Sequence, residues 1–199
     1  MSDPTAVNHH ADKPGFAGVT GLLFGLVFLL TGRRNARRAT ALTAVTAADH
    51  VVDIGCGPGS AARAAARRGA RVTGVDPAPT LLFLARAVTR RGAATTWAKG
   101  SAEAIPVSDG AATVVWALAT VHHWQDVSKG LAEVHRTLAP GGRLLAIERQ
   151  SPPGATGFAS HGWTAQQVES FAALCRTAGL VDVVIGGGQG VWTVLGVRP

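Results

Sequence analysis

A glycine-rich turn between an apolar run and a helical run is the feature that most limits the folds open to this chain. Residues 52–60 read VDIGCGPGS, so Gly55, Gly57 and Gly59 directly follow a buried-strand pattern. Glycine is needed where the backbone turns sharply, or where a ligand touches the main chain without Cβ atoms in between. A strand, a glycine turn and a helix in this order predict an α/β fold with a ligand site at the carboxyl ends of its strands.

The spacing of these glycines excludes two common phosphate-binding loops. A dinucleotide fingerprint, G-x-G-x-x-G, requires a glycine where Ser60 stands, and a Walker A loop requires a Gly-Lys-Ser/Thr run that is absent here. The next apolar run ends at Asp76. An acidic side chain there can accept hydrogen bonds from both hydroxyls of a ribose, or it can cap the helix that follows.

Short β-rich runs alternate with helical runs from residue 50 onward. Strands are predicted at residues 50–54, 71–75, 95–98, 112–117, 143–148, 181–185 and 191–197, and helices at 60–68, 79–91, 126–138 and 164–178. Only GGGQG separates the last two strands, so we expect them to pair as a hairpin. The pattern predicts an α/β, Rossmann-like, doubly wound seven-stranded sheet with an antiparallel C-terminal hairpin strand.

The first 45 residues are expected to precede this domain. Residues 1–14 are polar and predict a disordered lead. Residues 15–32 carry no charge and four arginines follow within residues 33–38, so 15–45 is predicted to be a hydrophobic and basic helical segment. This segment either packs on the domain or anchors the chain in a membrane through residues 15–38, with the rest of the chain in the cytoplasm. The domain itself is expected at 46–199.

Charge and cysteine content limit the partners. The formal net charge of +7 is compatible with an anionic partner. However, basic residues such as Arg63 and Arg67 lie one turn apart on predicted helices, which favours a solvated outer layer, and no nucleic-acid partner is expected. Cys56 and Cys175 are far apart and outside any C-x-x-C pattern, which is typical of a reduced interior. The sequence shows no Cys/His ligand cluster, so no metal site is predicted.

Four segments together resemble the class I S-adenosylmethionine-dependent methyltransferases, especially the small-molecule branch related to quinone-biosynthesis enzymes. VVDIGCGPG resembles the first motif of that family, VTGVDPAP the second, GSAEAIPVSDGAATVV the adenine-side segment and LAPGGRLLAIE the strand after the helix. The resemblance is most specific in the first two motifs. It implies S-adenosylmethionine as cofactor and a cytoplasmic enzyme that transfers a methyl group to an O, N or C atom of a small, apolar acceptor.

The resemblance also implies roles for particular residues. The glycines would pack under the methionine part of the cofactor, Asp53 would lie near its amino group, and Asp76 would hold the ribose. Ser101 and Ala102 would border the adenine, although the family often has Asp where this chain has Ser101, so Glu103 is a candidate substitute. The cofactor-binding residues expected on this basis are Asp53, Gly55, Cys56, Gly57, Gly59, Asp76, Pro77, Ser101, Ala102 and Ala117.

Two adjacent histidines are the candidate catalytic residues. His122 and His123 follow the strand predicted at 112–117, in a region that lines the acceptor pocket of relatives. Either imidazole could take a proton from an acceptor hydroxyl or amine, because histidine titrates near neutral pH. In the structural alternative, one histidine bonds to backbone and Asp126 caps the next helix.

Two alternative functions remain open from the sequence. One is a membrane-anchored methyltransferase that acts on a lipid or quinone, and the other is a non-catalytic module that binds S-adenosylmethionine. The sequence defines neither the acceptor nor the oligomeric state.

Overall fold

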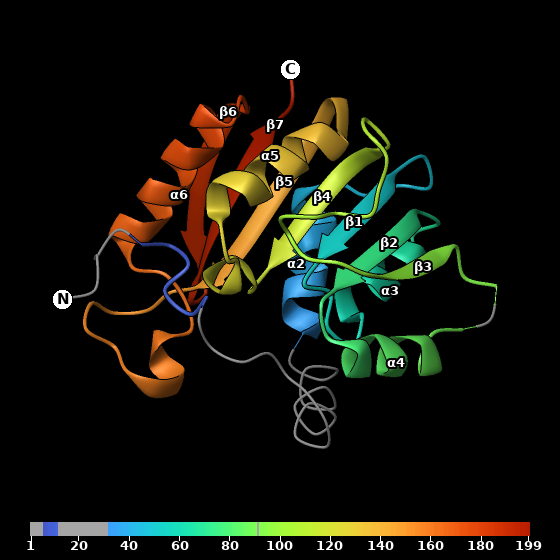
Figure 1. Cartoon of the computed structure of the whole chain (residues 1–199), viewed down its shortest axis with the longest axis horizontal. Coiled ribbons are helices and arrows are strands. Elements are labelled where there is room, and N and C mark those ends of the chain that lie inside the picture. Colours follow the sequence, from blue (N-terminus) through green and yellow to red (C-terminus); the bar gives the residue numbers. More distant parts are fainter. Residues whose placement is uncertain (1–5, 12–31, 91) are drawn as a thin grey trace.

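A single seven-stranded sheet forms the centre of the chain (Figure 1). The computed structural model describes residues 6–11, 32–90 and 92–199. Within them the strand order is β3-β2-β1-β4-β5-β7-β6, and β7 runs antiparallel to the other six strands. The strands are β1 (His50–Ile54), β2 (Arg71–Asp76), β3 (Thr95–Lys99), β4 (Ala112–Leu118), β5 (Leu138–Arg149), β6 (Val181–Gly188) and β7 (Val191–Val197). The predicted fold class, including the C-terminal hairpin, is confirmed.

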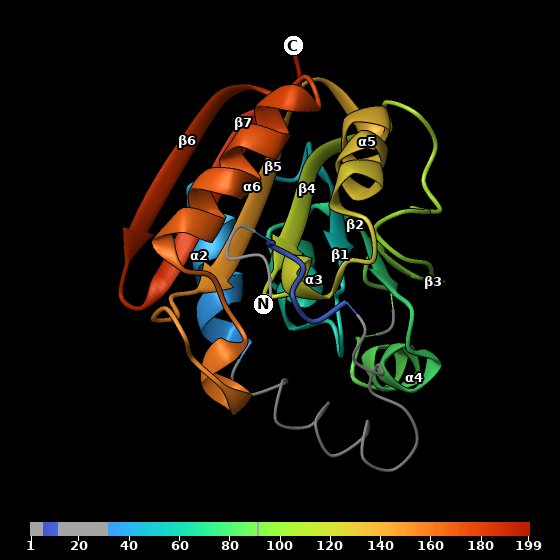
Figure 2. The same ribbon diagram turned by 60° about the vertical axis from the view of Figure 1, so that its left-hand side comes forward.

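Helices cover both faces of this sheet. Helices α5 and α6 lie on one face and α2 and α3 on the other, while α4 lies near the β3 edge (Figures 1 and 2). Their bounds are α2 (Arg33–Leu42), α3 (Ser60–Ala66), α4 (Pro79–Ala87), α5 (Val127–Thr137) and α6 (Ala165–Thr177), with 3-10 turns η1 (Val121–His123) and η2 (Gly157–Ser160). Two layers of helices around a mostly parallel sheet explain why the strands are apolar on both sides.

The core divides into two halves because side chains alternate along each strand. On β1, Val52 and Ile54 belong to the cluster under α5 and α6, whereas Val51 belongs to the cluster under α2 and α3. Helix α6 begins with a capping box, in which Gln167 N donates to the Thr164 hydroxyl and Thr164 N donates to the Gln167 side chain. These helices are therefore fixed by their ends as well as by their apolar faces.

Two element boundaries differ from the prediction by four residues or more, and the others by at most three. Helix α4 ends at Ala87 rather than at residue 91. Just beyond this end, the Thr89 hydroxyl donates to the Ala85 carbonyl and competes with the backbone N–H groups that would continue the helix. Strand β5 begins at Leu138 rather than residue 143. The first residues of β5 form backbone hydrogen bonds with the C-terminal residues, since Gly141 N donates to the Arg198 carbonyl.

The N-terminal residues 6–11, which we call the strap, pack on the domain. Val7 is 2% exposed and belongs to the main core cluster. Trp163 Nε1 donates to the Val7 carbonyl at 2.9 Å, and Asn8 Nδ2 donates to the Trp124 carbonyl at 3.0 Å. The predicted disordered lead is therefore wrong for these six residues, because buried donors of the domain satisfy their carbonyls.

The predicted apolar segment falls mostly outside the described residues. The structure describes the chain again from residue 32, where Arg33 begins α2 with Ala36 and Ala39 buried. Among the residues that the structure describes, no helix has both the length and the apolar character needed to cross a membrane.

Candidate active site

The glycine loop between β1 and α3 has a left-handed backbone at each of its three glycines. Gly55, Gly57 and Gly59 have φ values of +64°, +53° and +77°, a region that side chains with a Cβ rarely adopt. A Cβ on Gly55 would lie 2.1 Å from the Thr120 hydroxyl, and one on Gly59 would lie 2.1 Å from the Trp97 ring. A Cβ on Gly57 would meet no atom within 4 Å. The loop therefore presents an open backbone face at Gly57.

Asp76 connects the end of β2 to this loop. Its Oδ2 accepts a hydrogen bond from Gly57 N and its Oδ1 from Ala78 N, both at 2.8 Å. Burial raises the pKa of the Asp76 carboxyl. Each carboxylate oxygen has two lone pairs, so both oxygens keep acceptor capacity beyond these bonds. The next residue, Pro77, is exposed beside them.

A second carboxyl lies under the loop. Asp53 on β1 is 2% exposed, and its Oδ2 accepts from Ala62 N of α3 at 3.1 Å. Burial, together with the charge of Asp76, raises the pKa of Asp53 to about 7. Burial and the charges of Asp53 and Asp76 also raise the pKa of the Cys56 thiol, so this cysteine is an inert filler of the loop. A cation bound beside these two buried carboxyls would favour their ionised forms, whereas an anion would not.

On the other side of Asp76, the segment after β3 lies over the start of α5. Ser101 bridges to Ala104, and Ala102 is buried in the core. The Glu103 carboxylate accepts hydrogen bonds from Gln125 N at 2.8 Å and Asp126 N at 3.2 Å. Glu103 thus holds the loop before α5, and the Asp126 side chain caps that helix by accepting from Lys129 N, as predicted.

The chain turns sharply after β4 and crosses toward the glycine loop. Ala117 is buried within β4, where it pairs with Ile54 and Ala146. Ala119 has a φ of +57°, and Thr120 occupies the space that a side chain on Gly55 would need. This turn brings η1, with both predicted catalytic histidines, to the same sheet edge as the glycines.

The buried Glu148, which is not among the predicted site residues, holds the His122 ring. His122 Nδ1 donates to Glu148 Oε2 at 2.9 Å, and Glu148 Oε1 accepts from Val121 N at 2.8 Å. The Glu148 side chain is 0% exposed at the end of β5. Since a carboxylate holds Nδ1–H, the lone pair of His122 is on Nε2.

His123 has a different environment. Its Nδ1 donates to the His10 carbonyl at 3.4 Å. Burial, then the neighbouring His122, lowers the pKa of His123 to about 4. His123 is therefore neutral at pH 7 and a weak base.

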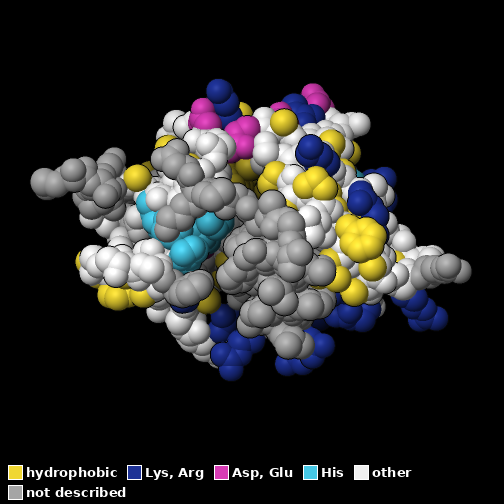
Figure 3. Space-filling view, turned by 60° about the horizontal axis from the view of Figure 1, so that its bottom comes forward, with side chains coloured by type: hydrophobic (Ala, Val, Ile, Leu, Met, Phe, Trp, Pro, Cys, Tyr) yellow, Lys and Arg dark blue, Asp and Glu magenta, His cyan; other side chains and the backbone are white. Residues whose placement is uncertain are grey.

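Five of the seven histidines of the chain gather at this edge, and we call them the histidine cluster: His9, His10, His122, His123 and His161. Ring centroids are 4.1 Å apart for His122–His123 and for His10–His161. Histidine side chains gather in one patch on the face that Figure 3 shows, although His10 and His122 are themselves buried. One ring nitrogen from each of His10, His122 and His123 lies within 4.8 Å of the others. The expectation that the chain has no histidine ligand cluster is therefore wrong.

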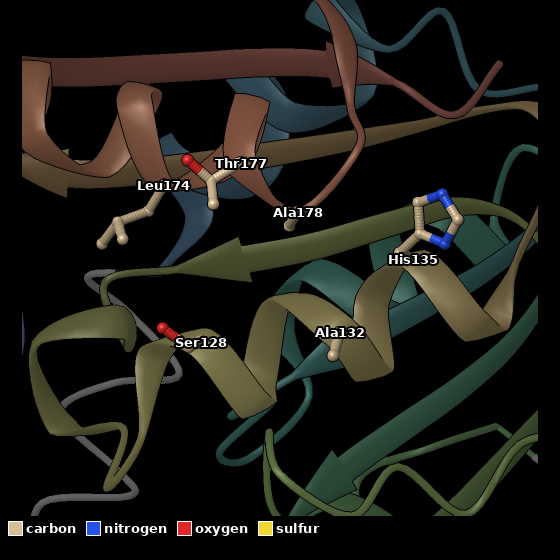
Figure 4. A pocket seen from close by; sticks show the side chains of 6 residues that line it. All are labelled: Ser128, Ala132, His135, Leu174, Thr177 and Ala178. Atoms are coloured by element: carbon tan, nitrogen blue, oxygen red, sulfur yellow. The ribbon is translucent and has the colours of Figure 1, made fainter.

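A separate hollow lies between α5 and α6 (Figure 4). Its lining residues are Ser128, Ala132, His135, Leu174, Thr177 and Ala178. His135 is the only titratable side chain among these six, so the hollow offers little chemistry compared with the glycine loop and the histidine cluster.

Comparison with known proteins shows similarity to methyltransferases. Residues 52–146 match the family described as "Methyltransferase domain". The chain is 38% identical to a demethylmenaquinone methyltransferase of Thermus thermophilus over 61% of this chain and 57% of that protein. It is 34% identical to a ubiquinone/menaquinone biosynthesis C-methyltransferase of Rubrivivax gelatinosus over 58% of this chain and 45% of that protein. The chain thus spans about half the length of these curated relatives.

A solved structure extends the likeness to the whole fold. The S-adenosyl-L-methionine complex of phosphoethanolamine N-methyltransferase 2 from Haemonchus contortus superposes with a TM-score of 0.75 at 16% identity, covering 98% of this chain and 60% of that one. At this identity the likeness shows the fold, which the chain shares with an S-adenosyl-L-methionine-binding methyltransferase. Over residues 52–146 the chain is similar to methyltransferase domains, and the two curated relatives are named as methyltransferases of quinone biosynthesis.

Proposed function

We propose that this chain transfers a methyl group from S-adenosylmethionine to an O, N or C atom of a small, apolar acceptor, with His122 as the general base. The observation that carries the proposal is the glycine loop, where an open backbone face at Gly57 lies beside the buried carboxyls of Asp53 and Asp76. The proposal includes a cytoplasmic location, which two free, buried cysteines favour.

The charge of the site fits this cofactor better than a dinucleotide. S-adenosylmethionine carries a sulfonium and an ammonium group, and both gain from a negative field. A pyrophosphate would instead meet the charges of Asp53 and Asp76 at the loop, and Ser60 replaces the third glycine of the dinucleotide fingerprint. The residues present therefore fit the cofactor of the family.

The individual roles follow from position. Gly57 admits the methionine part against the backbone, Asp53 faces its ammonium group, and Asp76 accepts from the ribose hydroxyls with its remaining lone pairs. Ser101 and Ala102 border the adenine. In the same proposal, Pro77 and Ala117 complete the walls of the cofactor site from the ends of β2 and β4.

The cofactor, when bound, supplies a methyl group already activated by its positive sulfur, so the protein needs to orient and deprotonate the acceptor rather than form a covalent intermediate. His122 Nε2 accepts the acceptor proton, and Glu148 fixes the tautomer and stabilises the resulting imidazolium. The strap packs on η1, where His10 N donates to the His122 carbonyl at 2.9 Å. In this proposal, the packed strap keeps water from this side of the site.

A quinone-like ring is the acceptor class that the relatives favour. Two of them are named as demethylmenaquinone and ubiquinone/menaquinone methyltransferases. A malonyl-acyl-carrier-protein O-methyltransferase of Serratia marcescens, 36% identical over 49% of this chain, shows that similar domains also serve O-methyl transfer. We therefore include a membrane-dissolved quinone or lipid among the acceptors to be tested.

Calorimetric titration with S-adenosylmethionine, S-adenosylhomocysteine and NAD tests the cofactor assignment. We expect the first two to bind and NAD not to bind, and Asp76→Asn to weaken binding at least about 10-fold through the lost charge-assisted bonds. Asp182→Asn, at an exposed position on β6, is the matched control and should bind as the wild type does. Binding of NAD alone would overturn the assignment.

Release of S-adenosylhomocysteine in the presence of quinol, phenol and fatty-acyl acceptors tests the transfer itself. Turnover with one class identifies the acceptor. Tight cofactor binding without turnover on any acceptor would instead support the non-catalytic module.

A further inference from the structure

We propose that His10, His122 and His123 form a binding site for a divalent transition-metal ion of the zinc class, with one ring nitrogen contributed by each residue. The three nitrogens lie within 4.8 Å of one another. In a tetrahedral site with Zn–N bonds of about 2.0–2.1 Å, ligand nitrogens are about 3.3 Å apart. Side-chain rotations that close the separation by up to about 1.5 Å would therefore complete the ligand set.

Hydrogen bonds already direct the tautomers toward metal binding. Glu148 holds Nδ1–H of His122, and the His10 carbonyl holds Nδ1–H of His123, which leaves Nε2 of both rings as the ligand atoms. The Ser160 hydroxyl donates to the Gly157 carbonyl at 2.8 Å, so it accepts from His10 Nε2 at 3.1 Å. The lone pair of His10 is then on Nδ1. Each ring thus has a nitrogen in the form that a metal ion requires.

The groups that hold the other ring nitrogens of His122 and His123 are of the kind that supports zinc ligands. A metal-binding histidine usually donates its other N–H to a carboxylate or a backbone carbonyl, which orients the ring and increases its basicity. Here the buried Glu148 carboxylate accepts the hydrogen bond from His122, and the His10 carbonyl accepts the one from His123. A chance surface group of histidines would lack such buried supports.

Three neutral imidazoles select the class of metal. Imidazole suits zinc, copper, nickel and cobalt, whereas magnesium and calcium prefer oxygen ligands. Three protein ligands leave the fourth tetrahedral position for a water molecule. The site also joins the strap to η1, so a bound ion would tie residues 6–11 to the body of the domain.

Metal binding has a consequence that rests on the proposed function. Nε2 of His122 would bind either the metal ion or the acceptor proton, so the ion should inhibit methyl transfer. Metal binding itself depends on no assumption about the reaction, and its test is independent of turnover.

The test is competition for Zn²⁺ between the tag-free full chain and a chromophoric chelator, with elemental analysis for stoichiometry. We expect one Zn²⁺ per chain. Glu148→Gln should weaken binding about 10- to 100-fold, and His10→Ala by at least about 100-fold. His135→Ala removes a histidine from the hollow between α5 and α6 and should bind as the wild type does.

Two further measurements keep the result unambiguous. His10→Asn keeps a polar side chain in the strap, and a thermal melt without metal establishes that each variant is folded. One equivalent of Zn²⁺ should raise the melting temperature of the wild type but not of His10→Asn. The absence of 1:1 binding in the wild type, or equal Zn²⁺ affinities of folded His10→Asn and His135→Ala, would overturn the proposal. If the protein binds Zn²⁺ but transfers no methyl group even after the metal is removed with a chelator, this site would stand and the result would count against the proposed function alone.

Discussion

The imidazole of His122 meets the carboxylate of Glu148 at 2.9 Å, and the Glu148 side chain has no exposed surface. The two residues are 26 positions apart, at the carboxyl ends of the neighbouring strands β4 and β5. A buried carboxylate is stabilised by such bonds, and Glu148 accepts a second one from Val121 N. The pair therefore fixes one tautomer of His122 at the edge of the sheet where the glycine loop also lies.

Glu148→Gln should lower kcat about 10- to 100-fold while the cofactor affinity stays within about twofold of the wild type. General base catalysis contributes about 10²–10⁴ in rate, and an amide orients the imidazole but no longer stabilises its cation. Steady-state kinetics with a saturating acceptor, combined with calorimetric titration of S-adenosylmethionine, separates the two effects. Glu169→Gln, at an exposed position of α6, is the matched control. An equal loss of cofactor affinity would show that Glu148 acts on the fold rather than on His122.

Gly57→Ala should weaken S-adenosylmethionine binding at least about 10-fold with only a modest loss of stability. The Cβ would project into the open face of the loop, and the left-handed backbone costs about 1–2 kcal/mol. Gly110→Ala is the matched control, because Gly110 has a φ of +62° and a Cβ there also meets no atom within 4 Å. The two variants should melt alike and differ in binding.

Gly55→Ala should behave differently from both. Its Cβ would lie 2.1 Å from the Thr120 hydroxyl, so steric overlap adds to the backbone strain. We expect a melting temperature clearly below that of Gly57→Ala. If Gly57→Ala bound the cofactor as the wild type does, the open face of the loop would not be the cofactor surface.

Local patterns explain why so much of the fold could be predicted. The predicted bounds of the strands His50–Ile54 and Val191–Val197 agree with the observed ones, because each apolar run borders a glycine turn, which follows the first strand and precedes the second. The capping box of Thr164 and Gln167 is a signal four residues long. The glycine loop was likewise visible, since its conformation depends on adjacent residues.

The histidine cluster could not be predicted, because it is assembled from distant segments. His10 and His123 are 113 positions apart and meet only because the strap packs along η1. Glu148 ended a predicted strand, but nothing in its local sequence indicates that β5 lies beside β4 and places it against His122. The sequence pairs His9-His10 and His122-His123 indicate that histidines are present, but a pair of histidines by itself does not reveal which rings meet in the fold.

Thr164→Ala should lower the free energy of unfolding by about 1 kcal/mol, the usual effect of losing a helix N-cap. For a chain of this size, that corresponds to about 2–4 °C in melting temperature. Calorimetric melts check this value, with Ser170→Ala on the same helix as control. The control should melt at or slightly above the wild-type temperature, because alanine favours helix and Ser170 bonds only to the preceding turn. Equal melting temperatures for both variants would mean that the capping box does not contribute to stability.

In the cofactor-free protein the contribution of Asp53 to stability should fall as the pH rises from about 4 to 7, so Asp53→Asn should gain stability relative to the wild type across this window. His123, whose pKa is lowered to about 4, contributes with the opposite sign in both proteins, so the difference between them isolates Asp53. The pKa of Asp53 is about 7 in the folded chain against an ordinary 3.8. Within that window the folded state holds a proton that the unfolded state releases, so unfolding becomes easier by up to about 1.4 kcal/mol per pH unit. Above pH 7 both states are ionised and this contribution levels off.

Thermal melts of the wild type and Asp53→Asn at pH 5 to 8 check the prediction. Asp76 retains part of the slope in the variant, because burial raises its pKa in the same direction. The variant should be the more stable protein at pH 8 and yet bind S-adenosylmethionine more weakly, since the charge that destabilises the empty site attracts the cofactor's ammonium group. Parallel pH profiles for the two proteins would show that Asp53 does not carry the buried charge.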